Sequence, residues 1–167
     1  MKVRPARIED ALSVAELREH GLLGLAATFE VAPQPSGDRR GIFGQDADRF
    51  PILVAEGEVG EIVGWVALSE HLPRNHHPGI AECSLFVEED HRGRGAGTKL
   101  LEAMIGQARM LGYWKLIARI LITDEASRAL CLSGGFREVG VLERHARQDG
   151  RWVDVVVVER LIPENQL

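Results

Sequence analysis

The sequence predicts an α/β (α+β) fold in which one mixed sheet carries helices on both faces. The first observation is length, because 167 residues is the size of one domain, and we treat residues 1–167 as a single domain. The second is composition, since 45% apolar and 27% charged residues are ordinary for a chain that buries its own core. The third is the element order, β-α-α-β-β-β-α-β-α-β-β, given by hydrophobic periodicity.

The composition also argues against several classes of function, including nucleic-acid binding and membrane spanning. The net charge is −5 and no run of basic residues occurs, which argues against a nucleic-acid partner. No apolar run approaches the ~20 residues needed to span a bilayer, and the first residues lack the apolar core of a signal peptide. Cys83 and Cys131 occur without a CxxC pair or a Cys/His cluster, so we expect a cytoplasmic location and no metal.

The first elements are a strand and a helix. The strand at 2–4 ends at Pro5. The helix is expected at 8–20, with Asp10 as its cap and Gly21 as its stop. Its apolar face is expected from Ala11, Leu12, Ala15 and Leu17.

The next segment contains a hairpin. Pro33, Pro35 and Gly37 break the chain, after which a short helix is expected at 39–48. Two apolar runs, 52–56 and 61–69, are separated by a glycine-containing turn and therefore predict a β-hairpin. A loop is expected at 71–79.

The second half alternates strands and helices before a final pair of strands. The clearest helix has apolar residues at spacings of three and four. The expected elements are strand 80–87, helix 98–111, strand 116–122, helix 124–133, and strands 136–144 and 152–161 around a turn at 148–150.

The most specific local pattern is HRGRGAGT at 91–98, between a predicted strand and the clearest helix. Glycines at every second position let backbone N–H groups converge on an anion, and the helix N-terminus adds a positive dipole end. Arg92 and Arg94 add charge. The pattern indicates a phosphate cradle, with a ligand-free glycine turn as the alternative.

Two well-known phosphate-binding motifs do not fit this loop. A P-loop needs GxxxxGK[ST], whereas Lys99 follows Thr98 in the wrong order. A dinucleotide fingerprint needs GxGxxG near the first strand and an acidic residue at the end of the next one. Here the glycines follow the fourth strand, and the next strand ends in Ile-Leu-Ile.

HRGRGAG resembles the [QR]xxGx[GA] loop that binds the coenzyme A pyrophosphate in GNAT acyltransferases. Four further segments resemble the subgroup that contains the phosphinothricin and methionine-sulfoximine N-acetyltransferases, namely AATFE (26–30), AECSLFV (81–87), DEASRALCLSGGF (124–136) and GRWVDVVVVER (150–160). The resemblance implies the GNAT fold, a mostly antiparallel mixed sheet splayed between its fourth and fifth strands. It also implies acetyl-CoA as co-substrate and a homodimer.

The resemblance implies a set of residues that hold the coenzyme. The backbone of the fourth strand would pair with the pantetheine arm, amides of the glycine loop would hold the pyrophosphate, and the following helix would flank the pantetheine. These residues are Leu85, Phe86 and Val87; Arg92, Gly93, Arg94, Gly95, Ala96, Gly97 and Thr98; and Asp124, Ser127 and Cys131.

Glu82 matches the family's carboxylate on the fourth strand, the candidate general base. An alkylammonium with a pKa near 10 must lose a proton before it attacks a thioester. A carboxylate becomes a stronger base when it is buried, and apolar neighbours surround Glu82 in the sequence. The structural alternative is a salt bridge to Arg74 or His77.

Cys131 stands where many relatives carry a tyrosine that protonates the departing thiolate. Tyr113, the chain's one tyrosine, does not match that position. A thiol can donate a proton, but a free cysteine is more commonly a small buried hydrophobe, which is the interpretation we favour.

The acceptor pocket is less clearly marked. In the resembled subgroup, arginines of the loop before the fourth strand grip an amino-acid carboxylate. Arg74 matches one of them, whereas Leu72 stands at the other. The expected acceptor-site residues are Phe29, Glu30, Arg74, Asn75, Trp152 and Asp154.

Two of these expectations have structural alternatives. Asp154 lies in a run of valines, so if it is buried it needs a partner such as Arg144 or His145. Adjacent His76 and His77 suggest a metal site, but no third ligand is evident and a solvated loop is the better interpretation.

The sequence therefore predicts an acetyl-CoA-dependent N-acetyltransferase. Its acceptor would be the primary amine of a small molecule, an amino acid or analogue of the phosphinothricin or methionine sulfoximine type, attacking directly in a ternary complex. Other acceptors are a protein N-terminus, a lysine or an aminoglycoside. A non-catalytic acyl-CoA-binding sensor is the alternative from another functional class.

Overall fold

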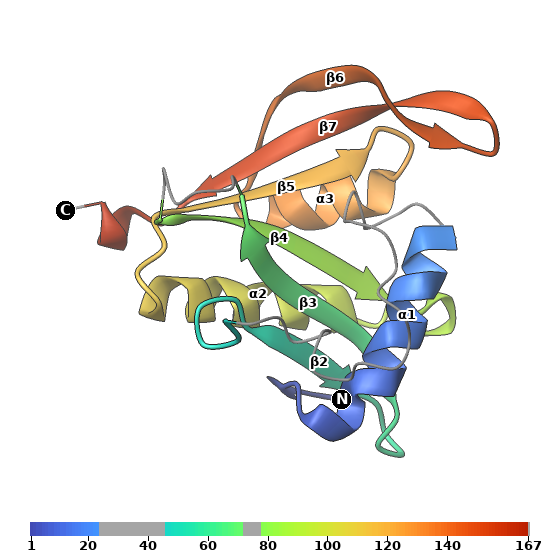
Figure 1. Ribbon diagram of the computed structural model, residues 1–167, viewed down its shortest axis with the longest axis vertical. Helices are drawn as coiled ribbons and strands as arrows, with labels where there is room; N and C mark the ends of the chain where they lie inside the picture. Colours follow the sequence, from blue (N-terminus) through green and yellow to red (C-terminus); the bar gives the residue numbers. More distant parts are fainter. Residues whose placement is uncertain (24–45, 72–77, 167) are drawn as a thin grey trace.

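The computed structural model describes residues 1–23, 46–71 and 78–166 (Figure 1). These ranges contain seven strands and three α-helices. The strands are β1 Lys2–Pro5, β2 Ile52–Glu56, β3 Ile62–Glu70, β4 Ile80–Val87, β5 Lys115–Leu121, β6 Arg137–Gln148 and β7 Arg151–Leu161. The helices are α1 Ala11–Leu23, α2 Ala96–Met110 and α3 Glu125–Ser133.

The strands form one sheet in the order β1-β2-β3-β4-β5-β7-β6. All neighbouring pairs are antiparallel except β4 and β5, which run parallel. A parallel pair needs a crossover connection, and α2 supplies it between β4 and β5. This topology confirms the predicted mixed, mostly antiparallel sheet.

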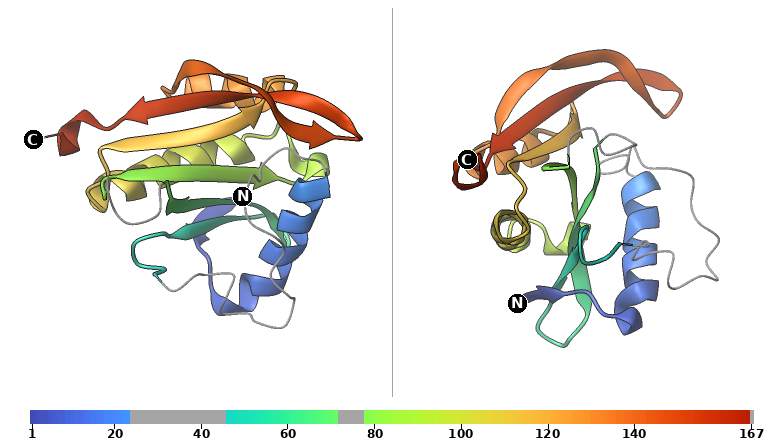
Figure 2. Two further views of the ribbon diagram at one scale, coloured as in Figure 1. Left: turned by 45° about the horizontal axis from the view of Figure 1, so that its top comes forward. Right: turned by 60° about the vertical axis from the view of Figure 1, so that its left-hand side comes forward.

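Helices cover both faces of the sheet, as predicted. Figure 2 shows α1 on one side and α2 with α3 on the other. On the first side, Val14 and Leu17 of α1 pack with Trp65 of β3. On the other, Leu100 and Met104 of α2 are fully buried against the centre of the sheet. Side chains of a strand alternate between the two faces of the sheet, so neighbouring residues of one strand pack into the hydrophobic clusters on opposite faces.

The sheet opens between β4 and β5. Their pairing covers only three residues of β4, from Ile80 to Glu82, and ends at Ile117 of β5. Beyond that point β4 stays paired with β3 as far as Val87, while β5 stays paired with β7 as far as Leu121. The two halves of the sheet therefore diverge, which confirms the predicted splay between these strands.

The prediction for the first helix was wrong in three details. Asp10 is not the N-cap, because it ends a 3₁₀ turn and its carboxylate accepts the Arg7 N–H at 2.7 Å and pairs with Arg4. Leu12 is 48% exposed. Gly21 does not stop the helix, which continues to Leu23. A glycine costs a helix only about 1 kcal/mol, which other interactions can offset.

Other boundaries also differ. Helix α2 begins at Ala96 rather than Thr98, because buried Ala96 is a strong helix former that directly follows the left-handed Gly95. Strand β6 continues past Arg144 as far as Gln148. The expected helix at 39–48 falls outside the described residues except for 46–48, where the chain forms a turn. No helix in the described ranges has the length and apolarity to cross a membrane.

Candidate active site

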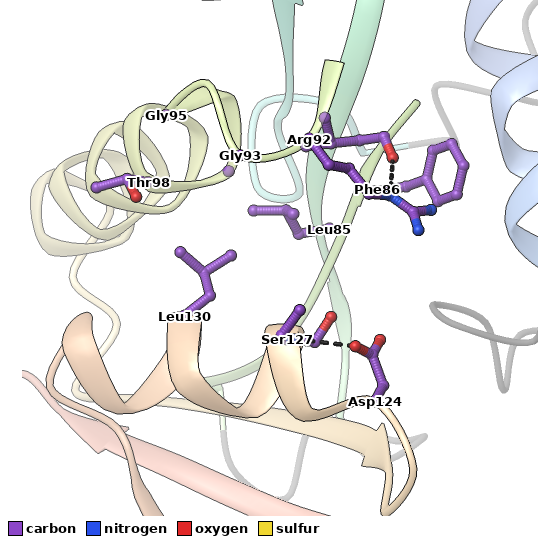
Figure 3. Close-up of a pocket in the computed structure, with 12 residues that line it drawn as sticks. Leu85, Phe86, Arg92, Gly93, Gly95, Thr98, Asp124, Ser127 and Leu130 are labelled. Carbon is purple, nitrogen blue, oxygen red and sulfur yellow. Dashed lines mark hydrogen bonds between the residues drawn. The ribbon is translucent and has the colours of Figure 1, made fainter. Parts of the chain in front are cut away.

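A cavity of about 450 Å³ lies between the end of β4, the glycine loop and the N-terminus of α3 (Figure 3). Most of the residues that the sequence assigned to the coenzyme meet on its walls. The lining residues are Leu85, Phe86, Val87, Arg92, Gly93, Gly95, Gly97, Thr98, Asp124, Ala126, Ser127 and Leu130. Ala126 and Leu130 were not predicted. Arg94 is exposed beside the cavity and Ala96 is buried in the core.

Backbone conformation at two glycines shapes the loop. Gly93 and Gly95 have φ of +71° and +83°, a region that side-chain-bearing residues seldom adopt. An added Cβ at either position would meet no protein atom within 4 Å. These positions therefore require glycine for conformation, and they leave open space beside a helix N-terminus, where N–H groups attract an anion.

The open edge of β4 presents backbone groups to the gap. The Glu88 N–H donates to the Val63 carbonyl at 2.9 Å, which sets the alternation of the β3–β4 ladder. Leu85 and Val87 therefore direct their N–H and C=O groups away from β3, toward the gap. An extended ligand lying there can pair with β4 as an additional strand.

Arg92 covers part of this edge. Its Nε donates to the Val87 carbonyl at 2.9 Å, and its guanidinium lies 5.6 Å from the centre of the Phe86 ring. Figure 3 shows the side chain directed toward Phe86 and away from the helix axis. The Arg92 side chain thus organises the β4 edge, in addition to the charge that the sequence analysis expected it to bring to the loop.

The start of α3 forms the opposite wall. The Asp124 carboxylate caps this helix by accepting the Ser127 N–H at 3.0 Å. One turn later, Leu130 lies so close to Gly97 that an added Cβ there would be 3.0 Å from Leu130 Cδ2. Asp124 therefore has a clear structural role in addition to the predicted coenzyme contact.

Glu82 lies where β4 and β5 begin to separate. Its Oε2 accepts a hydrogen bond from Arg119 Nη2 at 2.7 Å and lies 3.7 Å from His71 Nδ1. The Glu82 side chain is 14% exposed and that of Arg119 29%. The carboxylate is thus held on the same sheet face as Phe86, at the inner end of the open β4 edge.

Sequence reasoning missed both partners of Glu82. Arg119 had a detectable signal, because it is a charged residue within the apolar strand LIARIL. His71 had none, since it only follows the end of β3. The alternative partners considered, Arg74 and His77, lie outside the described residues.

Trp152 and Asp154 are not brought to Glu82 within this chain. Glu82 pairs with Ile117 of β5, which in turn pairs with Glu159 of β7, so Glu159 is the β7 residue level with Glu82. Trp152 lies seven residues from Glu159 along β7, or about 23 Å at ~3.3 Å per residue. Asp154 accepts the backbone N–H of Arg144 at 2.7 Å. Arg144 has φ of +50° and lies in a register shift of β6, so Asp154 holds a β-bulge.

Cys131 belongs to the core and not to the cavity wall. It is 9% exposed and packs among the residues beneath α2. Burial, followed by the nearby Asp124 carboxylate, raises the pKa of Cys131 to about 11. This location agrees with the small buried hydrophobe favoured from the sequence.

The remaining predicted acceptor residues, Phe29, Glu30, Arg74 and Asn75, lie outside the described residues. Within the described ranges, no three His, Cys, Asp or Glu side chains gather where they could hold a metal ion.

Comparison with known proteins explains this combination of a splayed sheet and a glycine loop. Residues 16–136 match the acetyltransferase (GNAT) family. The chain belongs to the GNAT family of acetyltransferases. The family membership inferred from HRGRGAG and the accompanying segments is therefore confirmed.

Individual GNAT relatives match nearly the whole chain. The L-methionine sulfoximine/L-methionine sulfone acetyltransferase of Pseudomonas aeruginosa is 28% identical over 94% of this chain and 92% of its own length. The L-amino acid N-acyltransferase MnaT of Escherichia coli is 29% identical over 98% and 95%. A crystal structure of a GNAT phosphinothricin acetyltransferase from Sinorhizobium meliloti, in complex with AcCoA, has a TM-score of 0.85 at 26% identity and covers 96% and 88%.

Proposed function

We propose that this GNAT acetyltransferase, as a single catalytic domain spanning residues 1–167, transfers an acetyl group from acetyl-CoA to the primary amine of a free amino acid or a close analogue. The observation that carries the proposal is the cavity between the glycine loop and the open β4 edge, together with Glu82 at the point of β4 where that edge begins. Relatives named for methionine sulfone, methionine sulfoximine, phosphinothricin and L-amino acids support the acceptor class.

The described residues suit acetyl-CoA. The amides between Arg92 and Thr98 would hold the pyrophosphate at the start of α2, where Gly93 and Gly95 leave space. The backbone of Leu85 and the N–H of Val87, whose carbonyl is bound by Arg92, would pair with the amide groups of the pantetheine arm. When bound, acetyl-CoA supplies the thioester whose carbonyl carbon the acceptor amine attacks.

Glu82 would prepare the acceptor. An ammonium that enters the site cannot act as a nucleophile until it gives up a proton, and Glu82 is the carboxylate at the inner end of the open β4 edge. Arg119 holds the carboxylate through Oε2, which leaves Oε1 to receive the proton directly or through a water molecule. The Glu82 side chain is mostly buried where β4 and β5 separate, which fixes the position of its carboxylate.

A thiol-release assay with acetyl-CoA tests the proposal. The panel comprises L-methionine sulfone, L-methionine sulfoximine, phosphinothricin, the protein amino acids, a peptide with a free N-terminus and lysine, and an aminoglycoside. We expect turnover of one or more of the amino-acid-type acceptors. Preferred turnover of the peptide or the aminoglycoside would contradict the acceptor class, and coenzyme binding without turnover would favour an acyl-CoA sensor.

We further propose that the enzyme is a cytoplasmic homodimer. The family resemblance implies the dimer, and β6 is an edge strand with the exposed apolar side chains Val139 and Val141. Free thiols at Cys83 and Cys131 suit a reducing compartment. Light scattering on the purified protein should give twice the 18.4 kDa chain mass, and a monomer would contradict the dimer.

A further inference from the structure

Arg119 occupies a distinctive place in the sheet. The β4–β5 ladder ends at Ile117, and Arg119 is the next residue on the same face of β5. Its Nη2 reaches back 2.7 Å to Glu82 Oε2 across the point where the strands separate. The open β4 edge ends at this same point, so a guanidinium stands beside the carboxylate that would receive the acceptor's proton.

A purely structural role explains this pair poorly. Partly buried ion pairs contribute little net stability, because each charge loses solvation when it leaves water. Arg119 also interrupts an apolar strand, where an aliphatic residue would pack without that cost. The Glu82 and Arg119 side chains nevertheless keep 14% and 29% of their surface exposed, so a small ligand can reach both.

The pair presents two opposite charges side by side, and an α-amino acid carries the complementary two. We propose that Arg119 binds the α-carboxylate of the acceptor while Glu82 receives its ammonium, so that the site selects free α-amino acids. This inference rests on the proposed acetyl transfer to an amine.

Binding leaves no charge without a partner. The Arg119–Glu82 contact through Oε2 stays in place, while the acceptor's carboxylate pairs with the remaining N–H donors of Arg119 and its ammonium with Glu82 Oε1, which avoids a buried unpaired ion. Arginine has five N–H donors in a planar fork, and Glu82 accepts from one nitrogen, Nη2. The fork can therefore donate to both oxygens of a carboxylate in a bidentate contact.

The test compares L-methionine sulfone with its α-carboxamide, which keeps the amine and loses the carboxylate. In Arg119→Met, kcat/KM for the acid should fall about 10- to 100-fold relative to that for the amide, mainly through KM. Arg119→Lys should retain part of the preference, because the charge remains without the fork. Arg128→Met is the matched control, since its guanidinium pairs with Glu138 at the surface of α3.

Calorimetry of the acid binding to the protein with CoA present gives a second readout that needs no turnover, and the affinity should fall by a similar factor. An equal loss for acid and amide would overturn the inference, because Arg119 would then act only by positioning Glu82. No loss of activity for either compound would also overturn it. The unsubstituted enzyme is assayed first. If it acetylates neither compound, the proposed function itself fails for this acceptor, and the variants carry no information on Arg119.

Discussion

The two sides of the β4–β5 gap differ in the groups that line them, which are backbone groups on one side and side chains on the other. The side that we propose for the coenzyme consists mainly of backbone groups, fixed by glycine conformations in one continuous segment and by the unpaired edge of one strand. The side that we propose for the acceptor is built from side chains on separate elements, with Glu82 on β4, Arg119 on β5 and His71 after β3. A backbone-built site tolerates changes in side chains, whereas a side-chain-built site can change its ligand through one substitution.

The largest effect is expected at Glu82. Glu82→Gln should lower kcat/KM for the amine by about 100-fold or more, because general-base catalysis typically contributes 10²–10⁴-fold. Its affinity for acetyl-CoA should stay within about twofold, since in our proposal backbone groups away from Glu82 hold the coenzyme. Steady-state thiol release and calorimetry measure the two quantities. Glu138→Gln, which alters an exposed ion pair, is the control, and equal turnover in both variants would refute the role of Glu82.

The coenzyme side is tested by a pair of glycines with the same backbone strain. Gly95 and Gly112 both have φ of +83° and open space at Cβ, but only Gly95 lines the cavity. Alanine at either position should cost about 1–2 kcal/mol of unfolding free energy. Only Gly95→Ala should also raise KM for acetyl-CoA, by about 10-fold, through its effect on the loop amides. Denaturant titration and kinetics separate the two effects, and an equal KM in both variants would argue against the anion cradle.

A substitution at Asp154 tests whether this residue, which the sequence analysis expected in the acceptor pocket, contacts the acceptor. Asp154→Ala should lower the unfolding free energy by about 1 kcal/mol, because the Arg144 N–H loses its acceptor at the β6 bulge. KM for the amine should stay within about twofold, since the register places Asp154 far from Glu82. A large KM increase in an intact, folded variant would restore the substrate contact expected from the sequence.

The smallest effect is expected at Cys131. Burial raises the pKa of Cys83 to about 12 and that of Cys131 to about 11, so both remain thiols at neutral pH. Iodoacetamide at pH 8.5 should therefore label the native protein slowly and the unfolded protein rapidly. Cys131→Ala should keep kcat within about threefold. A much larger loss of kcat, restored by Cys131→Ser, would indicate that the side chain donates a proton.

The sign of the thiol contribution follows from these shifts. A raised pKa in the folded state means that the unfolded chain loses its thiol protons first as the pH increases. The contribution of the two buried thiols to stability is thus complete below about pH 8.5, the ordinary thiol pKa, and declines as the pH rises toward their folded values. Cys131→Ala should reduce this alkaline decline.

Secondary structure was most predictable where it depended on local pattern. Helix α2, with apolar residues at helical spacing, forms within two residues of its predicted bounds. Strands β2 and β4 have the bounds predicted from their apolar runs. Predictions failed where tertiary contacts outweighed local signals. Asp10 is drawn into an ion pair with Arg4 on another element, and the β6 bulge depends on Asp154 of β7. The sequence offered Arg144 as a candidate partner of Asp154, but it did not predict that the backbone N–H would make the contact or that a bulge would form there.

By itself, the sequence determined the family, through the resemblance of HRGRGAG and four further segments, and it determined the glycine loop, because glycines at alternate positions before an amphipathic helix are a local pattern with a local consequence. Only the tertiary structure brought Arg119 to Glu82, which are 37 residues apart. Their meeting depends on the parallel β4–β5 register and its end at Ile117. Such a register is fixed by packing of the whole sheet, so the sequence can mark Arg119 as a charge within an apolar strand but cannot say that Glu82 is its partner.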